Sequence, residues 1–105
     1  MLLYNVSVTM DKDIETEWLQ WMKEIHIPEV MATGCFLESL IYRLLHQPSG
    51  DDPTYVIQYR CESQEKLNTY FEKFADALRD KHNGRYKNRF VAFRTVMEEV
   101  DRIRL

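Results

Sequence analysis

The sequence predicts an α+β domain in which four antiparallel strands carry two helices on one face. Apolar side chains alternate along residues 1–10 and 54–61, which is typical of half-buried strands. They recur at helical spacing in residues 14–25 and 67–78, and breaker residues separate these segments. The 105 residues, 45% of them hydrophobic, are enough for one core, so we expect a single domain over residues 1–105.

Composition excludes several classes of protein. Three Gly, three Pro and no biased tract exclude a disordered or collagen-like chain. No apolar run is long enough for a membrane span, and the first residues lack the pattern of a signal peptide. The two cysteines, Cys35 and Cys61, are too few for a disulfide scaffold and have no metal-ligand spacing, so we expect small buried thiols. The sequence therefore predicts a reduced, cytoplasmic protein without a metal or other cofactor.

The first half of the chain begins with a strand and continues into a helix that Asp11 or Asp13 caps. Because Pro28 disfavours helical geometry at the residue before it, we expect this helix to end near His26. Pro28 then opens a short second helical turn, and Gly34 supplies the left-handed residue that ends it. The apolar stripe of the helix consists of Ile14, Trp18, Trp21, Met22 and Ile25.

The second half repeats this alternation of strands and helices. Residues 35–46 are rich in Leu, Ile, Phe and Tyr without a breaker, and we expect a strand there, with a helix as the alternative. Residues 47–53 have the composition of a turn. After the third strand, Ser63 caps a second helix that ends at residues 83–84, and residues 90–100 form the last strand. The apolar stripe of this helix consists of Leu67, Tyr70, Phe71, Phe74 and Leu78.

Elements in the order β-α-β-β-α-β with right-handed crossovers form the ferredoxin-like fold, with both helices on one face of the sheet. We expect the helices to cover the more apolar side of each strand, which consists of Tyr4, Val6, Val8, Tyr55, Ile57, Tyr59, Val91, Phe93 and Thr95. The uncovered face is expected to hold Asn5, Ser7, Gln58, Arg60, Ala92 and Arg94, with Phe36, Leu40, Tyr42 and Leu44 or the alternate set of that strand. A face of this mixed character is typical of an interface. We therefore expect a homodimer that packs two such faces together and encloses a cleft lined by their polar residues.

His26 and Glu29 are the candidate catalytic residues. An imidazole at the mouth of such a cleft can serve as general acid or base near neutral pH, and Glu29 can orient it. The alternative is structural, because the helix dipole favours a histidine near a helix C-terminus and a glutamate in a first helical turn. The sequence leaves both interpretations open.

Arg60 and Arg94 are the candidate ligand-binding residues, because the predicted alternation places both on the face without helices. A guanidinium can hold a carboxylate or phosphate through two hydrogen bonds, with Asn5 and Gln58 as polar neighbours. The alternative is an ion pair, across strands or between subunits, with an acidic residue such as Glu38 or Glu98.

A basic stretch runs through residues 79–94, where six Lys and Arg side chains accompany only Asp80. It is either a patch that attracts anions or a solvated helix end and loop. RNA binding on the sheet would require exposed aromatic rings, and Tyr4, Tyr55 and Tyr59 could serve only if the two faces were exchanged. We therefore expect neither a nucleic acid nor a membrane as partner.

Residues 26–36 (HIPEVMATGCF) resemble the His-x-Pro…Gly-Phe segment of the dimeric α/β-barrel superfamily. Its members include antibiotic-biosynthesis-type monooxygenases, muconolactone-isomerase-like proteins and stress-responsive barrel proteins. Residues 61–67 (CESQEKL) resemble the Trp-x-Ser-x-Glu-x-Leu segment of that group, with Cys61 in place of the Trp. This departure argues against a haem-degrading monooxygenase, whose site uses the Trp. The resemblance implies the fold and a dimer.

A second resemblance covers nearly the whole chain and is to a small bacterial family of domains of unknown function. It is carried by residues 4–6, 18–22, 26–30, 32–36, 58–61 and 89–95. It implies no activity, because a fold does not determine a function.

Three functions remain open. The first is a non-catalytic homodimer that binds a small anionic or aromatic ligand, or a protein partner, in the cleft. The second is a cofactor-independent monooxygenase or isomerase with His26 as the base and Arg60 or Arg94 holding an anion. The third, which we rank last, is RNA binding.

Overall fold

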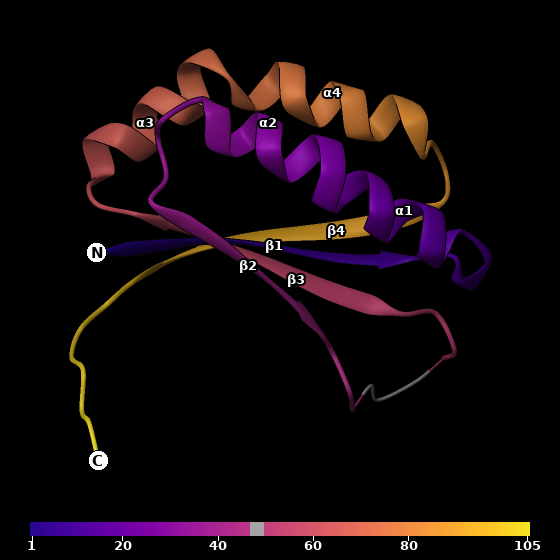
Figure 1. Ribbon diagram of the computed structural model, residues 1–105, viewed down its shortest axis with the longest axis horizontal. Coiled ribbons are helices and arrows are strands. Elements are labelled where there is room, and N and C mark those ends of the chain that lie inside the picture. Colours follow the sequence, from indigo (N-terminus) through magenta and orange to yellow (C-terminus); the bar gives the residue numbers. More distant parts are fainter. Residues whose placement is uncertain (47–49) are drawn as a thin grey trace.

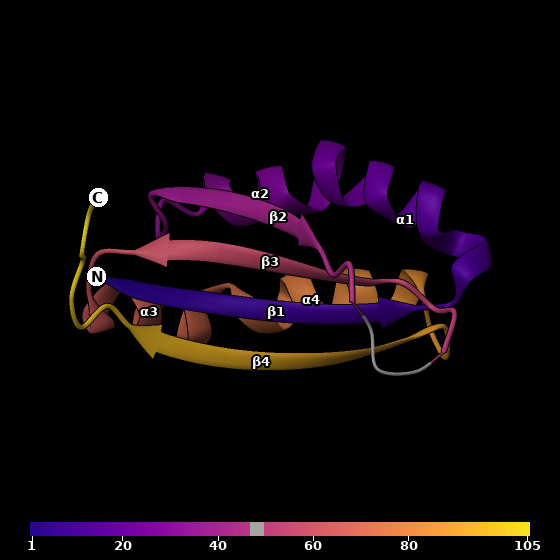
Figure 2. The ribbon, with the colours of Figure 1, turned by 90° about the horizontal axis from the view of Figure 1, so that it is seen from below.

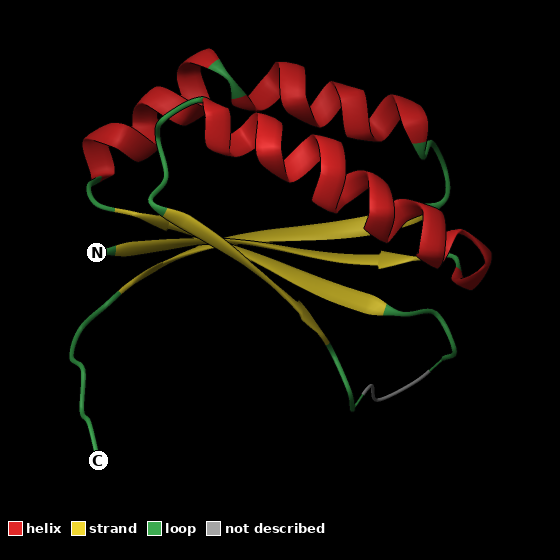
Figure 3. Ribbon diagram, viewed as in Figure 1, coloured by secondary structure: helices red, strands yellow, loops and turns green. Residues whose placement is uncertain are grey.

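One four-stranded antiparallel sheet carries a single layer of helices, as Figures 1 and 3 show for the computed structural model. The structure describes residues 1–46 and 50–105. The strands are β1 (Leu2–Met10), β2 (Glu38–Arg43), β3 (Thr54–Cys61) and β4 (Phe90–Glu98), in the spatial order β2-β3-β1-β4. The helices cover one face of the sheet, and Figure 2 shows the molecule from the other, open face. The predicted ferredoxin-like α+β fold is confirmed.

The first helical segment is continuous across Pro28, so the predicted end near His26 was wrong. It consists of η1 (Lys12–Ile14, a 3-10 turn), α1 (Glu15–Trp21), η2 (Met22–His26, a π-helical turn) and α2 (Ile27–Ala32). Proline has no N–H to donate, and its ring clashes with the carbonyl four residues earlier in an α-helix. The wider π turn, in which the Ile27 N–H reaches back to the Met22 carbonyl, relieves this conflict. Gly34 follows with a φ of 76°, as predicted.

The predicted aspartate caps of this segment were also wrong. Asp11 precedes η1 but its side chain makes no capping hydrogen bond, and Ile14 precedes α1. The carboxylates of Asp11 and Asp13 instead accept hydrogen bonds from Arg89, at 2.5 Å each. Both aspartate side chains therefore bind Arg89, which is distant in sequence, and neither caps the helix.

The second helical segment is divided at Phe74 into α3 (Gln64–Lys73) and α4 (Ala75–Arg85). Ser63 caps α3 as predicted, because its Oγ accepts a hydrogen bond from the Lys66 N–H at 3.2 Å. The segment ends at Arg85, just beyond the predicted end. Among the described residues, no helix has the length and apolar character needed to cross a membrane.

Two predicted strands are shorter in the structure. The strand predicted for residues 35–46 covers only Glu38–Arg43. Phe36, expected on the uncovered face, precedes the strand and is buried in the core, where its ring packs on Tyr59 and Tyr70. The last strand ends at Glu98 rather than at residue 100. Of the turn predicted at 47–53, residues 47–49 lie outside the described residues.

The two central strands present the predicted sides to the helices. Tyr4 and Val8 of β1 pair with Tyr59 and Tyr55 of β3, and all four side chains are buried beneath the helices. The opposite sides of the strands form the open face.

In the edge strand β4, the side that faces the helices is the opposite of the one predicted. Ala92 pairs with Val8 and Arg94 pairs with Val6, so Ala92 and Arg94 face the helices. Val91 and Phe93 lie on the open face, where Phe93 is 72% exposed. The rule that the more apolar side of a strand faces the core fails here, because the open face itself carries large apolar side chains.

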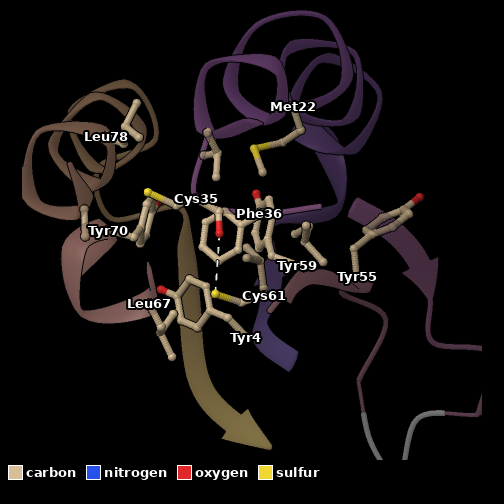
Figure 4. Close-up of a cluster of buried hydrophobic side chains, with 14 of the residues drawn as sticks. Tyr4, Met22, Cys35, Phe36, Tyr55, Tyr59, Cys61, Leu67, Tyr70 and Leu78 are labelled. Atoms are coloured by element: carbon tan, nitrogen blue, oxygen red, sulfur yellow. Dashed lines mark hydrogen bonds between the residues drawn. The ribbon is translucent and has the colours of Figure 1, made fainter. Parts of the chain in front are cut away.

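An aromatic cluster around Tyr4 fills the space between the sheet and the helices (Figure 4). The ring centroid of Tyr4 lies 6.1 Å from that of Phe36 and 5.2 Å from that of Phe71, the latter edge to face. The dashed line in Figure 4 marks the Cys61 thiol donating a weak hydrogen bond to the Cys35 carbonyl at 3.4 Å. Both thiols are buried, as predicted.

The replacement Ser63→Ala is expected to lower the free energy of unfolding by about 1 kcal/mol, because the Lys66 N–H loses its acceptor. Urea unfolding at fixed protein concentration, followed by circular dichroism, measures the change. Ser63→Asp keeps an acceptor and is the matched control, with stability close to that of the wild type. Equal loss in both variants would contradict the capping role.

Candidate functional site

A cavity lies between the helices and the covered side of the sheet. Its volume is about 30 Å³, room for one or two water molecules. Aliphatic side chains of both layers form part of the wall. The polar lining consists of Tyr4, His26, Tyr59, Tyr70, Arg79, His82 and Arg94, and no acidic residue is among the lining residues.

Two arginines in this lining lack an acidic partner among residues 1–46 and 50–105. Arg79 on α4 donates from Nη2 to the Tyr4 hydroxyl at 3.1 Å, while its Nε is buried without any hydrogen-bond partner. Arg94 on β4 is exposed and forms no ion pair in that part of the chain, which places a free guanidinium at the opening of the cavity. A buried donor without a partner is costly, so this lining is arranged to receive acceptors.

The neighbouring cations of the basic stretch behave differently. Lys81 pairs with Glu29 at 2.7 Å, Arg85 pairs with Glu17, and Arg89 pairs with two aspartates. These contacts join the acidic first helical segment to the basic second one. Three cations of the stretch form no ion pair in the described residues: Arg79 and Arg94, which line the cavity, and Lys87, which is exposed in the turn before β4.

Two histidines in the cavity are held neutral at pH 7. The Trp18 indole N–H donates to Nε2 of His82 at 2.9 Å, which makes Nε2 the acceptor and leaves the proton on Nδ1. His26, the last residue of η2, stacks on Trp21 with ring centroids 5.1 Å apart and lies 5.8 Å from the His82 ring. Burial is the main cause that lowers the pKa of each histidine to about 4. Two neutral imidazoles therefore line a site that has no negative charge among its lining residues.

Tyr59 and Tyr70, two tyrosines of the cavity lining, stay protonated at neutral pH. Burial raises the pKa of Tyr59 and of Tyr70 well above the usual value. The site thus offers guanidinium groups, neutral imidazoles and aromatic rings. This arrangement can bind an anion and accept a proton, and no group of three or more His, Cys, Asp or Glu suited to a metal ion occurs in the described ranges.

Of the residues predicted to form one site, only His26 and Arg94 line the cavity. Asn5, Gln58 and Arg60 lie on the open face, on the other side of the sheet from the cavity. Arg60 forms the cross-strand ion pair that was the alternative interpretation, with Glu38 at 3.0 Å.

Two further predictions concern the partner of Glu29 and the exposure of three tyrosine rings. Glu29 binds Lys81, and no hydrogen bond joins it to His26 in the described chain. The rings of Tyr4, Tyr55 and Tyr59 are at most 6% exposed, so they offer no surface on which an RNA base can stack.

Arg79 and His82 are site residues that the sequence interpretation missed. His82 lies four positions after Leu78, the last residue of the predicted apolar stripe, so helical spacing places it on the covered face. An imidazole that continues a core stripe was the available signal. Nothing in the local sequence distinguishes Arg79 from the paired cations that follow it.

A protein family described as a domain of unknown function (DUF4286) matches residues 1–100. No curated protein matches the sequence.

Several solved structures share the fold. HapK from Hahella chejuensis is 8% identical, with a TM-score of 0.71 over 100% of this chain and 98% of that one. A dimeric ferredoxin-like protein from an uncultured marine organism is 13% identical, with a TM-score of 0.67 over 100% of both chains. An antibiotic biosynthesis monooxygenase is 13% identical, with a TM-score of 0.63 over 96% of this chain and 100% of that one. At these identities the likeness is one of fold alone.

The free energy of unfolding is expected to fall between pH 6.5 and pH 4. Both histidines have a lower pKa when folded than when unfolded, so unfolding takes up protons in this range and acid favours the unfolded state. For one such histidine the loss between pH 7.5 and pH 5 is about 2 kcal/mol. His82→Gln keeps an acceptor for Trp18 but does not titrate, so its urea midpoint should depend less on pH. An equally steep dependence in that variant would show that His82 is not responsible.

Proposed function

The chain belongs to the family of domains of unknown function DUF4286, and we propose that it forms a homodimer in which each copy binds a small organic anion. The anion occupies the cavity between the sheet and the helices. The observation that carries the proposal is the pair of arginines, Arg79 and Arg94, that line this cavity without a carboxylate partner in the described residues.

The chemistry of the lining favours a carboxylate attached to an aromatic or other planar body. A guanidinium binds a carboxylate through two charge-assisted hydrogen bonds, and Nε of Arg79 is a donor in need of an acceptor. Tyr4, Tyr59 and Tyr70 supply aromatic walls. Because the cavity holds only one or two waters, a ligand of this size requires lining side chains to move apart, and Arg94 is the lining arginine with the greater exposure.

A second candidate function is proton transfer to or from the bound anion. The observation in its favour is that neutral His26 lines the same cavity as the two arginines. A base of this kind would suit the cofactor-independent monooxygenase or isomerase chemistry considered above. Turnover that disappears in His26→Gln while anion binding persists would support it.

The dimer is supported by the open face of the sheet. Its exposed apolar side chains are Leu40, Tyr42, Val91, Phe93 and Met97, each at least 40% exposed. They lie on the two edge strands, β2 and β4, on either side of the polar side chains of β1 and β3. Exposed apolar side chains on an uncovered sheet face are typical of an interface, and two such faces can pack about a two-fold axis. A solved structure of the same fold is described as a dimeric ferredoxin-like protein.

Benzoate is expected to raise the thermal unfolding temperature of the wild type, and uncharged benzyl alcohol is expected to have little effect. Arg79→Met and Arg94→Met should each weaken benzoate binding about tenfold, because each removes a charged hydrogen bond. Arg60→Met is the matched control on the open face and should bind as the wild type does. Loss of binding in the Arg60 variant alone would move the ligand to the cleft between the sheets.

Phe93→Asp is expected to convert the dimer to a monomer, since the charge would be buried between two sheets. Light scattering after size exclusion gives the mass of each variant. Ile25→Asp is the control, because Ile25 is 45% exposed on η2, within the helix layer. A wild-type mass equal to one chain would refute the dimer.

A further inference from the structure

The segment after β4 extends beyond the body of the molecule. Residues 99–105 have no regular secondary structure, and Figure 1 shows them running away from the sheet on the side opposite the helices. The Glu99 N–H donates to the Met1 carbonyl at 2.9 Å, which fixes the point of departure. Beyond it, an ion pair between Arg102 and Glu99 at 3.0 Å is local to the segment.

Apolar side chains of this segment are almost wholly exposed to solvent in a single copy. Val100 and Ile103 are each 90% exposed, and Leu105 is fully exposed. Three large aliphatic side chains within six residues, all in water, are unusual for a surface that binds nothing. The segment leaves on the side of the open face, which is the proposed dimer interface.

A groove on the open face can accommodate such side chains. It has a volume of about 510 Å³ and lies where β1 begins and where β3 and β4 end. Leu3, Leu40 and Met97 form its apolar floor. Residues 99–102, the start of the segment itself, form one wall of this groove. Glu98 and Asp101 are in the lining, and neither has a cationic partner in the described part of the chain.

Charge and reach both suit the same segment of a second copy. Arg104 stands between Ile103 and Leu105 and has no acidic partner in its own described chain, so it complements the unpaired carboxylates at the groove. Two sheets that pack face to face are about 10 Å apart, and seven extended residues span up to about 23 Å. The segment is therefore long enough to cross from one sheet to the other.

We infer that residues 99–105 form an arm that crosses to the second copy, where Ile103 and Leu105 fill the partner's groove and Arg104 faces its acidic edge. This inference rests on the proposed homodimer. The arm then strengthens the dimer and closes the open end of the space between the two sheets.

The double substitution Ile103→Glu/Leu105→Glu tests the arm in the full chain. We expect the dissociation constant of the dimer, measured by sedimentation equilibrium, to rise at least tenfold. Thr16→Glu/Gln20→Glu adds the same two charges to exposed positions on the helix side and should leave it unchanged. A dimer of unaltered affinity in the arm variant would overturn the arm and leave the dimer standing, whereas a monomeric wild type would overturn both.

A cross-linking experiment locates the arm directly. In the variant Leu40→Cys/Leu105→Cys, oxidation with copper phenanthroline is expected to give a band of twice the chain mass on a non-reducing gel. Either single substitution alone is expected to give far less of this band. An internal disulfide, which keeps the mass of one chain, would mean that the arm folds back on its own groove and would overturn the exchange.

Discussion

The pairing of β4 with β1 determines both surfaces of this molecule. Because Val6 lies opposite Arg94, the guanidinium of Arg94 is directed under the helices and reaches the cavity. The same register turns Val91 and Phe93 outward onto the open face. A slip of one residue would exchange the two sets, leaving the cavity without one of its cations and the open face with a charge at its edge.

The cavity wall is held by contacts between elements that are distant in the sequence. Trp18 of α1 donates to His82 of α4, and the His82 ring packs edge to face on Phe90 of β4 at 4.5 Å. One imidazole thus ties two helices and the edge strand together. Its burial is also what keeps it neutral, so the packing that shapes the site sets its protonation state.

The central part of the fold could be predicted because its signals are local. Alternation of apolar residues in β1 and β3 identifies both the strands and their covered sides. Ser63 marks the start of α3, because its side chain accepts a hydrogen bond from the N–H of Lys66, three residues later. Pro28 led to the wrong helix end because a helix can either stop before a proline or accommodate it through a π turn, and the choice depends on what the helix packs against. The side of β4 could not be read from hydrophobicity, since both faces of this sheet carry apolar residues. The role of Arg79 could not be predicted, because its lack of an acidic partner depends on which residues the fold brings near it and not on the local sequence.

The π turn has a geometric effect on the helix that contains it. Twelve residues separate Trp18 from Val30, which in an uninterrupted α-helix is about three and a third turns, so the two would point in clearly different directions. Both side chains are nevertheless buried, 0% and 1% exposed. A π turn holds one residue more than its rise requires, and subtracting that residue returns Val30 to the phase of Trp18. His26 is the last residue of this π turn. The extra residue therefore keeps one buried stripe along the whole helical segment and also places the His26 imidazole in the cavity lining.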